Sequence, residues 1–223
     1  GQPSDRGWIN DHRVIEVLDT VDGPVQVVSD QSFSIGENVH CRIDWDRRFD
    51  HMQQHTGQHI LSQAFMKSAG VETVSFHLGT DSATIDLPIE TLPDKTWLEI
   101  ETGANRVVAE NHPIRVYTID DSEQEKLPVR KISSREGAIR IVEIDQWDYS
   151  PCGGTHCRAT GEVGIIKIVR LERVRQQLRV HFCCGFRALR DYQKKSFLVR
   201  DLGQSLSCGE GDLFENVNKQ LEG

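Results

Sequence analysis

No run of apolar residues in this sequence is long enough to span a membrane, and no charged-then-apolar signal segment stands at its start. An excess of positive charge is also missing, because 34 acidic and 26 basic residues give a formal net charge of −8. The composition therefore excludes a general attraction to nucleic acid, and a contact with an acidic partner would need a local basic patch. No membrane contact and no obligate protein partner are expected.

The six cysteines do not have the pattern of a disulfide-stabilised secreted domain. They are scattered over 223 residues, and two of them, Cys183 and Cys184, are adjacent. Disulfide scaffolds are usually short and dense in cysteine. We therefore expect a reducing cytoplasmic location, in which a cysteine close to a histidine indicates a metal site.

The succession of apolar patterns predicts an α+β fold in three parts. Residues 1–46 should form a small β-barrel-like N-terminal module, because Val- and Ile-rich runs alternate there with turn residues. Residues 47–185 combine helical and strand periodicities and should form a two-layer α/β domain. Residues 186–223 should form a C-terminal helical arm. The chain begins abruptly with Gly1 and its last helical pattern is short, so we expect a truncated sequence.

A helix carries the first histidine motif. It is predicted to begin near Asp50, with Gln53 completing a capping box, and to end at Gly70. Within it, His55 and His59 are four residues apart. Residues at this spacing lie on one face of a helix, about 5.4 Å apart along its axis, so both imidazoles can reach one ion. An isolated pair of this kind is as readily explained by a solvated stripe of histidines.

A second motif, "SPCGGTHC", makes the metal site the better explanation. Cys152 and His156 are four residues apart and enclose Gly153 and Gly154, which is typical of a tight loop rather than a helix. A thiolate and an imidazole from this loop would complement two helical imidazoles. The set His55, His59, Cys152 and His156 suits tetrahedral zinc.

Two questions about such a zinc site stay open. Four protein ligands are typical of a structural site, whereas catalytic zinc usually keeps one position for water or substrate. His51 lies a full turn before His55, so we expect it outside the coordination sphere, behind a ligand or in solvent. Cys157 would point away from the metal and is expected to be a core thiol.

In combination, these motifs resemble a known family. "HTGQH" with "CGGTH" resembles the editing domain of alanyl-tRNA synthetases and its freestanding relatives, the AlaX proteins. "GQPSDRG" resembles the end of the glycine-rich motif in the longer AlaX forms, and "DWDRRFDHMQQH" and "GFRALRDYQKK" are also similar to those forms. The editing domain of threonyl-tRNA synthetases shares the two metal motifs but is not expected to carry the glycine-rich segment.

This resemblance implies zinc-dependent hydrolysis of mischarged alanine tRNA in trans, chiefly of Ser-tRNA(Ala), with Gly-tRNA(Ala) as a second candidate. It makes residues 47–185 a zinc-binding editing domain and implies the same four metal ligands. The backbone amides of Gly153, Gly154 and Thr155 become candidates to stabilise the developing oxyanion. A serine-selective pocket needs polar contacts, for which the candidates are Thr56, Gln58 and His77. Gln58 and His77 stand where the synthetases commonly carry threonine and glutamine.

Basic residues could bind the tRNA phosphates. Arg47 and Arg48 lie beside the metal-binding helix and could meet the terminal nucleotides. A larger group in the C-terminal third includes Lys167, Arg170, Arg187 and Lys194, and a second cluster comprises Lys126, Arg130, Lys131, Arg135 and Arg140. For each single residue, a solvated surface position is the simpler interpretation.

Two other classes of function compete with the deacylase. The motifs could belong to a non-catalytic tRNA-binding module in which zinc only supports the fold. A metallohydrolase of another class is disfavoured, because an HExxH protease needs a glutamate directly after the first histidine, where this chain has Thr56.

Overall fold

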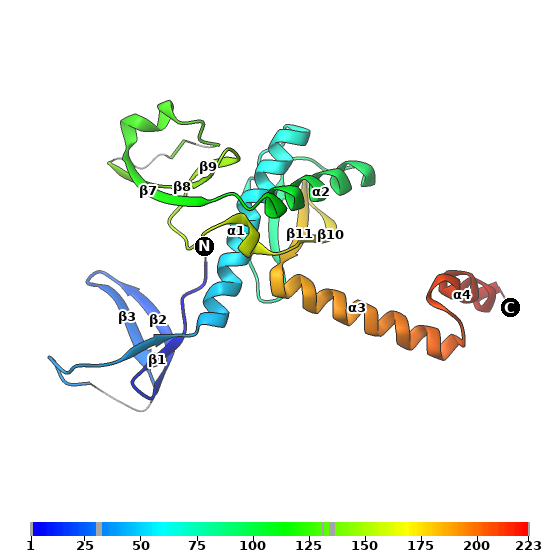
Figure 1. Ribbon diagram of the computed structural model, residues 1–223, viewed down its shortest axis with the longest axis horizontal. Helices are drawn as coiled ribbons and strands as arrows, with labels where there is room; N and C mark the ends of the chain where they lie inside the picture. Colours follow the sequence, from blue (N-terminus) through cyan, green and yellow to red (C-terminus); the bar gives the residue numbers. More distant parts are fainter. Residues whose placement is uncertain (1, 30–32, 131, 134–136, 223) are drawn as a thin grey trace. The chain divides into compact units, whose positions relative to one another are not determined.

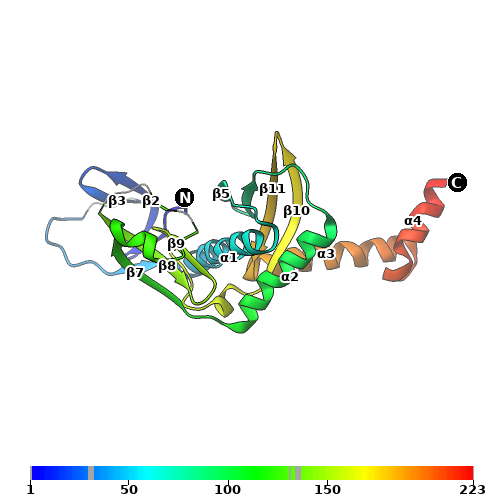
Figure 2. The same cartoon turned by 90° about the horizontal axis from the view of Figure 1, so that it is seen from above.

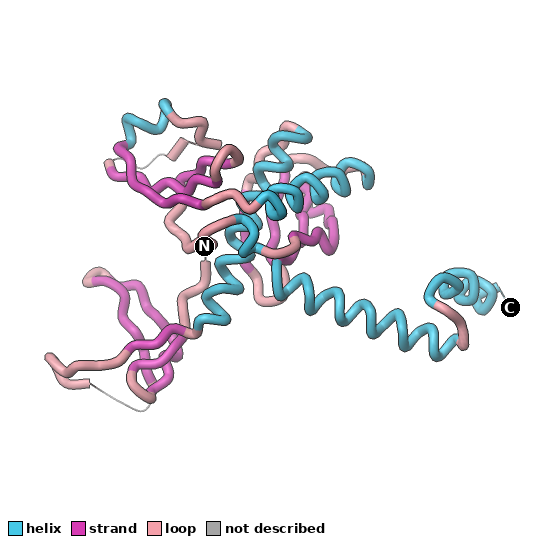
Figure 3. Tube along the Cα trace, in the orientation of Figure 1, coloured by secondary structure: helices cyan, strands magenta, loops and turns pink. Residues whose placement is uncertain are grey.

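The computed structural model describes residues 2–29, 33–130, 132, 133 and 137–222 (Figure 1). The chain forms two compact units, Gly1–Gly185 and Phe186–Gly223. The described residues contain four α-helices and three separate sheets, so the fold is mixed, as the α+β prediction requires (Figure 3).

The N-terminal strands form an open antiparallel sheet. Strands β1 (Gly7–Ile9), β2 (His12–Thr20), β3 (Gly23–Val28) and β4 (Cys41–Ile43) lie in the order β3-β2-β1-β4. β3 and β4 are the two edges, and within the described residues no pairing joins them. The N-terminal residues are therefore rich in β-strand, but the part of them that the structure describes is an open sheet and not the expected barrel-like module.

Helix α1 (Trp45–Ala69) is longer than the sequence pattern predicted. Its N-cap is Asp44, whose side chain accepts a hydrogen bond from the Arg47 amide at 3.3 Å. The prediction of a start near Asp50 was wrong because both aspartates are suitable caps and the earlier one is used. The end is as predicted, since Gly70 adopts a left-handed conformation with φ of 66°.

Polar residues of α1 are buried as well as apolar ones. The side-chain amide of Gln54 is fully buried and pairs with the backbone of Cys184: its Nε2 donates to the carbonyl at 3.0 Å, and its Oε1 accepts from the N–H at 2.8 Å. Buried polar groups need such partners, because an unmade hydrogen bond in the interior costs about 1–3 kcal/mol. This pair fixes α1 against strand β11 (Gln177–Cys184).

The main core lies between two helices and a four-stranded antiparallel sheet (Figure 2). The sheet contains β5 (Ser75–Leu78), β6 (Ala83–Leu87), β10 (Ile166–Val174) and β11 in the order β10-β11-β6-β5. Helix α2 (Asp94–Glu110) packs beside α1. The core residues of these elements include Phe65, Ile100, Ile85, Ile166 and Phe182.

A smaller sheet carries the cysteine motif. Strands β7 (Ile114–Asp120), β8 (Ala138–Ile144) and β9 (Asp148–Pro151) form an antiparallel sheet in the order β7-β8-β9, with the short helix η1 (Asp121–Lys126) after β7. β9 leads directly into the loop that begins at Cys152, and helix η2 (Thr160–Val163) follows that loop. The indole N–H of Trp147 donates to the carbonyl of Ile60 at 3.3 Å, so the start of β9 is held against α1.

The C-terminal unit is helical. Helix α3 (Gly185–Leu206) is followed by the short helix η3 (Glu210–Asp212) and by α4 (Leu213–Glu222). Among the described residues, none of the helices has both the length and the apolar composition that a membrane crossing requires.

The close approach of α1 to β11 gives a stability prediction. A methyl group at Gly57 would overlap the Sγ atom of Cys184, whereas a methyl group at Gly103 in α2 meets no atom within 4 Å. Overpacking a core costs about 1–3 kcal/mol, and alanine favours a helix over glycine by about 1 kcal/mol. We expect Gly57→Ala to lower the free energy of unfolding by up to about 2 kcal/mol and Gly103→Ala to raise it by about 0.5–1 kcal/mol.

Urea unfolding in the presence of a metal chelator measures both variants without a contribution from bound metal. Equal stabilisation by the two substitutions would contradict the close packing at Gly57.

Candidate metal centre and its cavity

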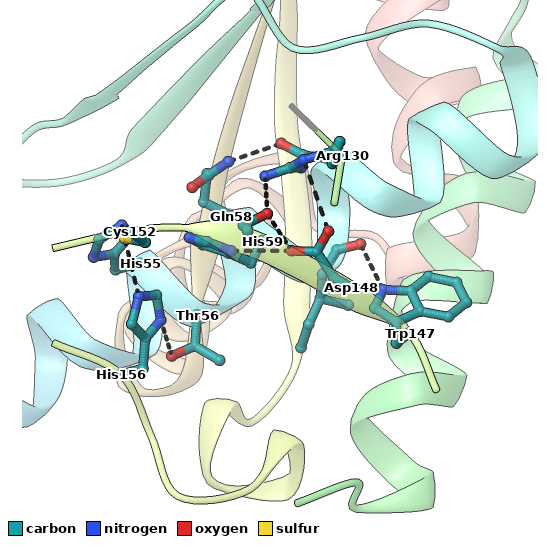
Figure 4. A network of polar contacts seen from close by, with 12 residues as sticks. His55, Thr56, Gln58, His59, Arg130, Trp147, Asp148, Cys152 and His156 are labelled. Carbon is teal, nitrogen blue, oxygen red and sulfur yellow. Dashed lines mark hydrogen bonds and ion pairs between the residues drawn. The ribbon is translucent and has the colours of Figure 1, made fainter. Parts of the chain in front are cut away.

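The structure brings the two motifs together (Figure 4). His55 and His59 come from the middle of α1, and Cys152 and His156 come from the loop after β9. One ligand atom from each of the four residues lies within 4.8 Å of the others. The Sγ atom of Cys152 is 3.4 Å from Nε2 of His55 and 3.4 Å from Nε2 of His156.

These distances and donors fit zinc. Tetrahedral zinc places its sulfur and nitrogen ligands about 3.6 Å apart, as follows from its usual bond lengths. Burial alone would raise the pKa of the Cys152 thiol, but hydrogen bonds from His156, His55 and His59 outweigh it and lower the pKa to about 2. Burial is also the main reason why the pKa of His156 falls to about 3. A thiolate and a neutral imidazole are the forms that bind a metal.

Each of the three imidazoles has a polar partner at Nδ1. The partner of His55 is the Gln2 side-chain oxygen at 3.4 Å, that of His156 is the Thr56 hydroxyl at 3.2 Å, and that of His59 is the Asp148 carboxylate at 3.1 Å. A partner at Nδ1 determines which ring nitrogen is left for a metal. The centre is therefore pre-organised for binding through Nε2.

The glycine loop packs tightly against α1. A methyl group at Gly154 would overlap the imidazole of His55, whereas one at Gly153 would meet nothing within 4 Å. The Gly154 amide donates to the Cys152 sulfur at 3.4 Å. The Thr155 amide donates to the side-chain oxygen of Gln2 at 3.1 Å. Two of the three candidate oxyanion donors thus already have acceptors.

A cavity of about 470 Å³ opens beside the metal centre. Its walls include His55, His59 and Cys152 together with the following residues: Gln58, Glu72, Thr73, Val74, Ser75, Phe76, Arg130, Ile132, Ser133, Ser150 and Pro151. The ring of Phe76 stacks on His55, with 5.4 Å between the ring centroids. The cavity can therefore hold a small polar group against the metal ligands.

The three residues expected in a substrate pocket have different positions. Gln58 lines the cavity, and its Nε2 donates to the Ser62 hydroxyl at 2.9 Å. Thr56 is fully buried behind His156, where its hydroxyl also accepts from the Cys157 amide at 3.0 Å. His77 is exposed and follows Phe76 in β5, so the alternation of the strand directs it away from His55. The structure thus brings only Gln58 to the cavity wall.

Acidic neighbours pair with several basic residues that were expected to meet tRNA. Arg48 pairs with Asp5, Lys167 with Glu101 at 2.7 Å, and Arg170 with Glu172 at 3.0 Å. Arg47 donates to the Ser4 carbonyl, Arg187 is buried, and Lys194 is exposed on α3. In the second cluster, Lys131 and Arg135 lie outside the described residues. A phosphate would compete with these carboxylates, which weakens a purely electrostatic contact.

Other predictions concern the neighbours of the ligands. His51 is outside the metal group, as expected, but it is buried rather than solvated. Cys157 is buried and packs in the main core, as predicted. Asp148 was missed, although it stands only four residues before Cys152. Gln2 was noted only as part of a glycine-rich segment, because no local pattern links a terminal glutamine to residues far along the chain.

Comparisons with known proteins agree with this geometry. Residues 139–179 match the family described as the threonyl and alanyl tRNA synthetase second additional domain. The chain is 36% identical to alanyl-tRNA editing protein AlaX-L of Pyrococcus horikoshii, over 99% of this chain and 55% of that protein. It is 37% identical to an alanine–tRNA ligase of Pyrococcus furiosus, over 98% of this chain and 25% of the ligase.

An animal relative matches as well. The chain is 33% identical to alanyl-tRNA editing protein Aarsd1 of Bos taurus, over 98% of this chain and 50% of that protein. It therefore spans about half the length of the editing proteins that it matches. The resemblance indicated by the two metal motifs is confirmed, because the chain is similar over almost its whole length to alanyl-tRNA editing proteins.

Proposed function

We propose that the protein hydrolyses the ester bond of mischarged alanine tRNA in trans, chiefly Ser-tRNA(Ala), with Gly-tRNA(Ala) as a second substrate. The observation that carries this proposal is the convergence of His55, His59, Cys152 and His156, because the first three of these residues also line one cavity. The names of the relatives support alanyl-tRNA editing. The cytoplasm, where aminoacyl-tRNA is used, is the location that this substrate implies.

The four residues of the centre would hold Zn²⁺, which suits their mixture of thiolate and imidazole. When bound, zinc can lower the pKa of a water molecule or orient polar groups of a substrate. The protein's own contribution is to position the ester within the cavity and to stabilise charge on its carbonyl oxygen. An aminoacyl ester is already activated, so modest assistance is sufficient.

The Thr155 amide is one candidate donor to that oxygen, provided that the substrate replaces its present acceptor. It already donates to a carbonyl oxygen, that of the Gln2 side chain, which lies beside His55. A substrate carbonyl has the same hydrogen-bonding character, so this amide points where such an oxygen can be held. Gly153 and Gly154 remain candidates for the same role.

Selectivity for serine would come from the cavity wall. A pocket that only accommodates alanine cannot strongly reject serine, whereas a pocket that hydrogen-bonds the serine hydroxyl can reject alanine. Gln58 lines the cavity and carries an amide with both a donor and an acceptor. We assign it the contact with the hydroxyl. Terminal phosphates of the tRNA would be met by Arg47 and Arg48 at the start of α1.

A non-catalytic tRNA-binding module is the second candidate. The observation that favours it is the presence of four protein ligands, a number typical of closed structural zinc sites. In that case the zinc would hold the loop of Cys152 against α1 and take no part in hydrolysis.

Deacylation assays separate these two functions. We expect purified protein to release serine from serine-charged alanine tRNA and to leave correctly charged alanine tRNA intact. The measurement is the loss of labelled amino acid from the tRNA with time. Binding of tRNA without release from either substrate would reject the hydrolase and favour the binding module.

Removal of the thiolate should remove metal and activity together. Mutation of a residue that only hydrogen-bonds a metal ligand typically weakens metal binding roughly 10–100-fold. We expect Cys152→Ala, which removes a ligand itself, to weaken zinc binding by more than this. Zinc content by elemental analysis and the deacylation rate measure the two effects. Cys41→Ala, at an exposed free thiol, is the matched control and should change neither. Full activity after complete chelation of the metal would refute a role for zinc in hydrolysis.

The glycine loop gives a second paired test. Gly154→Ala places a methyl group against His55 and should displace its imidazole, whereas Gly153→Ala has free space. Because displacement by a fraction of an ångström disturbs a metal site, we expect at least a roughly 10-fold weaker zinc affinity for Gly154→Ala. The zinc affinity of Gly153→Ala should equal that of the protein without the substitution. Competition with a chromophoric chelator measures both, and equal affinities would contradict the packing described here.

A further inference from the structure

The buried carboxylate that contacts His59 behind the metal centre has further contacts, which the function described so far does not use. Asp148 is the first residue of β9 and is 1% exposed. A carboxylate without compensating contacts is costly to bury, so one in this position needs an explanation.

The contacts of Asp148 lie on two sides. Its Oδ2 accepts from Nδ1 of His59 at 3.1 Å and from the Ser150 hydroxyl at 2.8 Å. Its Oδ1 lies 3.8 Å from Nε of Arg130 and, among the described residues, has no hydrogen bond. Arg130 in turn donates from Nη2 to Ser150 at 3.2 Å. The carboxylate therefore lies between a metal ligand and two residues of the cavity wall (Figure 4).

This arrangement distinguishes His59 from the other two histidines. The Nδ1 partners of His55 and His156 are a neutral amide and a neutral hydroxyl, whereas that of His59 is a carboxylate. A carboxylate behind a histidine fixes its tautomer and increases its basicity as a ligand. The Asp148 carboxylate also places a second negative charge, in addition to that of the Cys152 thiolate, near the position that zinc would occupy.

We infer that Asp148 is a positioning residue for the metal centre, which holds Nε2 of His59 toward the metal and fixes Ser150 and Arg130 in the adjacent cavity wall. This inference rests on the zinc site of the proposed function but not on the hydrolysis reaction. The alternative is a purely structural ion pair between Asp148 and Arg130. A structural pair would stabilise the metal-free fold, whereas a positioning residue acts mainly on metal affinity.

The experiment measures zinc affinity and the stability of the metal-free protein in the same variants of the 223-residue chain. Asp148→Asn removes the charge and keeps the shape, and Asp148→Ala also removes the contact. We expect zinc affinity, from chelator competition, to fall roughly 10–100-fold, with the larger loss for Asp148→Ala. The urea midpoint of metal-free Asp148→Asn should stay close to that of the unchanged protein.

Asp145→Asn is the matched control, since it removes the same charge three residues earlier from a carboxylate that pairs with Arg115. It should leave zinc affinity unchanged. Cobalt in place of zinc gives an independent measurement, because its visible spectrum reports the coordination geometry. We expect this spectrum to change in Asp148→Ala and not in Asp145→Asn.

Unchanged zinc affinity in both Asp148 variants would overturn the inference, as would a loss no larger than that of Asp145→Asn. If Asp148→Ala does not fold without metal, Ser150→Ala decides. That variant keeps the carboxylate but removes one of its hydrogen bonds, so it should weaken zinc binding measurably, and an unchanged affinity would again overturn the inference. No assay here uses tRNA, so absence of deacylation would reject the proposed function and leave this inference standing.

Discussion

A buried imidazole offers one nitrogen to a metal only when its other nitrogen is held by a partner, and the whole metal centre depends on this constraint. The partners come from three distant places: Gln2 precedes the first strand, Thr56 lies within α1, and Asp148 begins β9. The N-terminal segment, the long helix and the small sheet therefore each contribute a contact that orients one of the three imidazoles. The centre is thus a product of the tertiary fold of residues 1–185.

Local patterns were sufficient to propose the four residues that the structure brings together and to predict a mixed fold of helices and sheets. The spacing of His55 and His59 fixes their common helical face, and the glycines between Cys152 and His156 indicate a loop, so the four ligands could be proposed without the structure. The partners of the imidazoles could not be found in this way. Asp148 is one of many aspartates in the chain, and its distance from His59 follows from the packing of β9 on α1, which no local pattern encodes.

The features of the structure that the sequence did not indicate also have local causes. Asp44 and Asp50 are both suitable caps in the sequence, and the structure shows that Asp44 is the one used. Strand alternation places Phe76 rather than His77 beside His55, but the register of β5 follows from its pairing with β6. The acidic partner of Lys167, Glu101, comes from α2, so the charge of Lys167 looked available in the sequence alone, whereas the partner of Arg170, Glu172, lies two residues along the same strand.

The burial of α1 has a consequence for how this protein can change over time. From Gln53 to Leu61 every side chain of the helix is buried, and the same nine positions supply two metal ligands, a wall of the cavity, the contact with Cys184 and part of the apolar core. Few substitutions in such a segment can be neutral, because a residue that is replaced in one of these roles also disturbs the neighbouring residues in the other roles. New specificities should therefore arise more readily from the opposite wall, where Ser75 is exposed and Ser133 lies outside regular secondary structure.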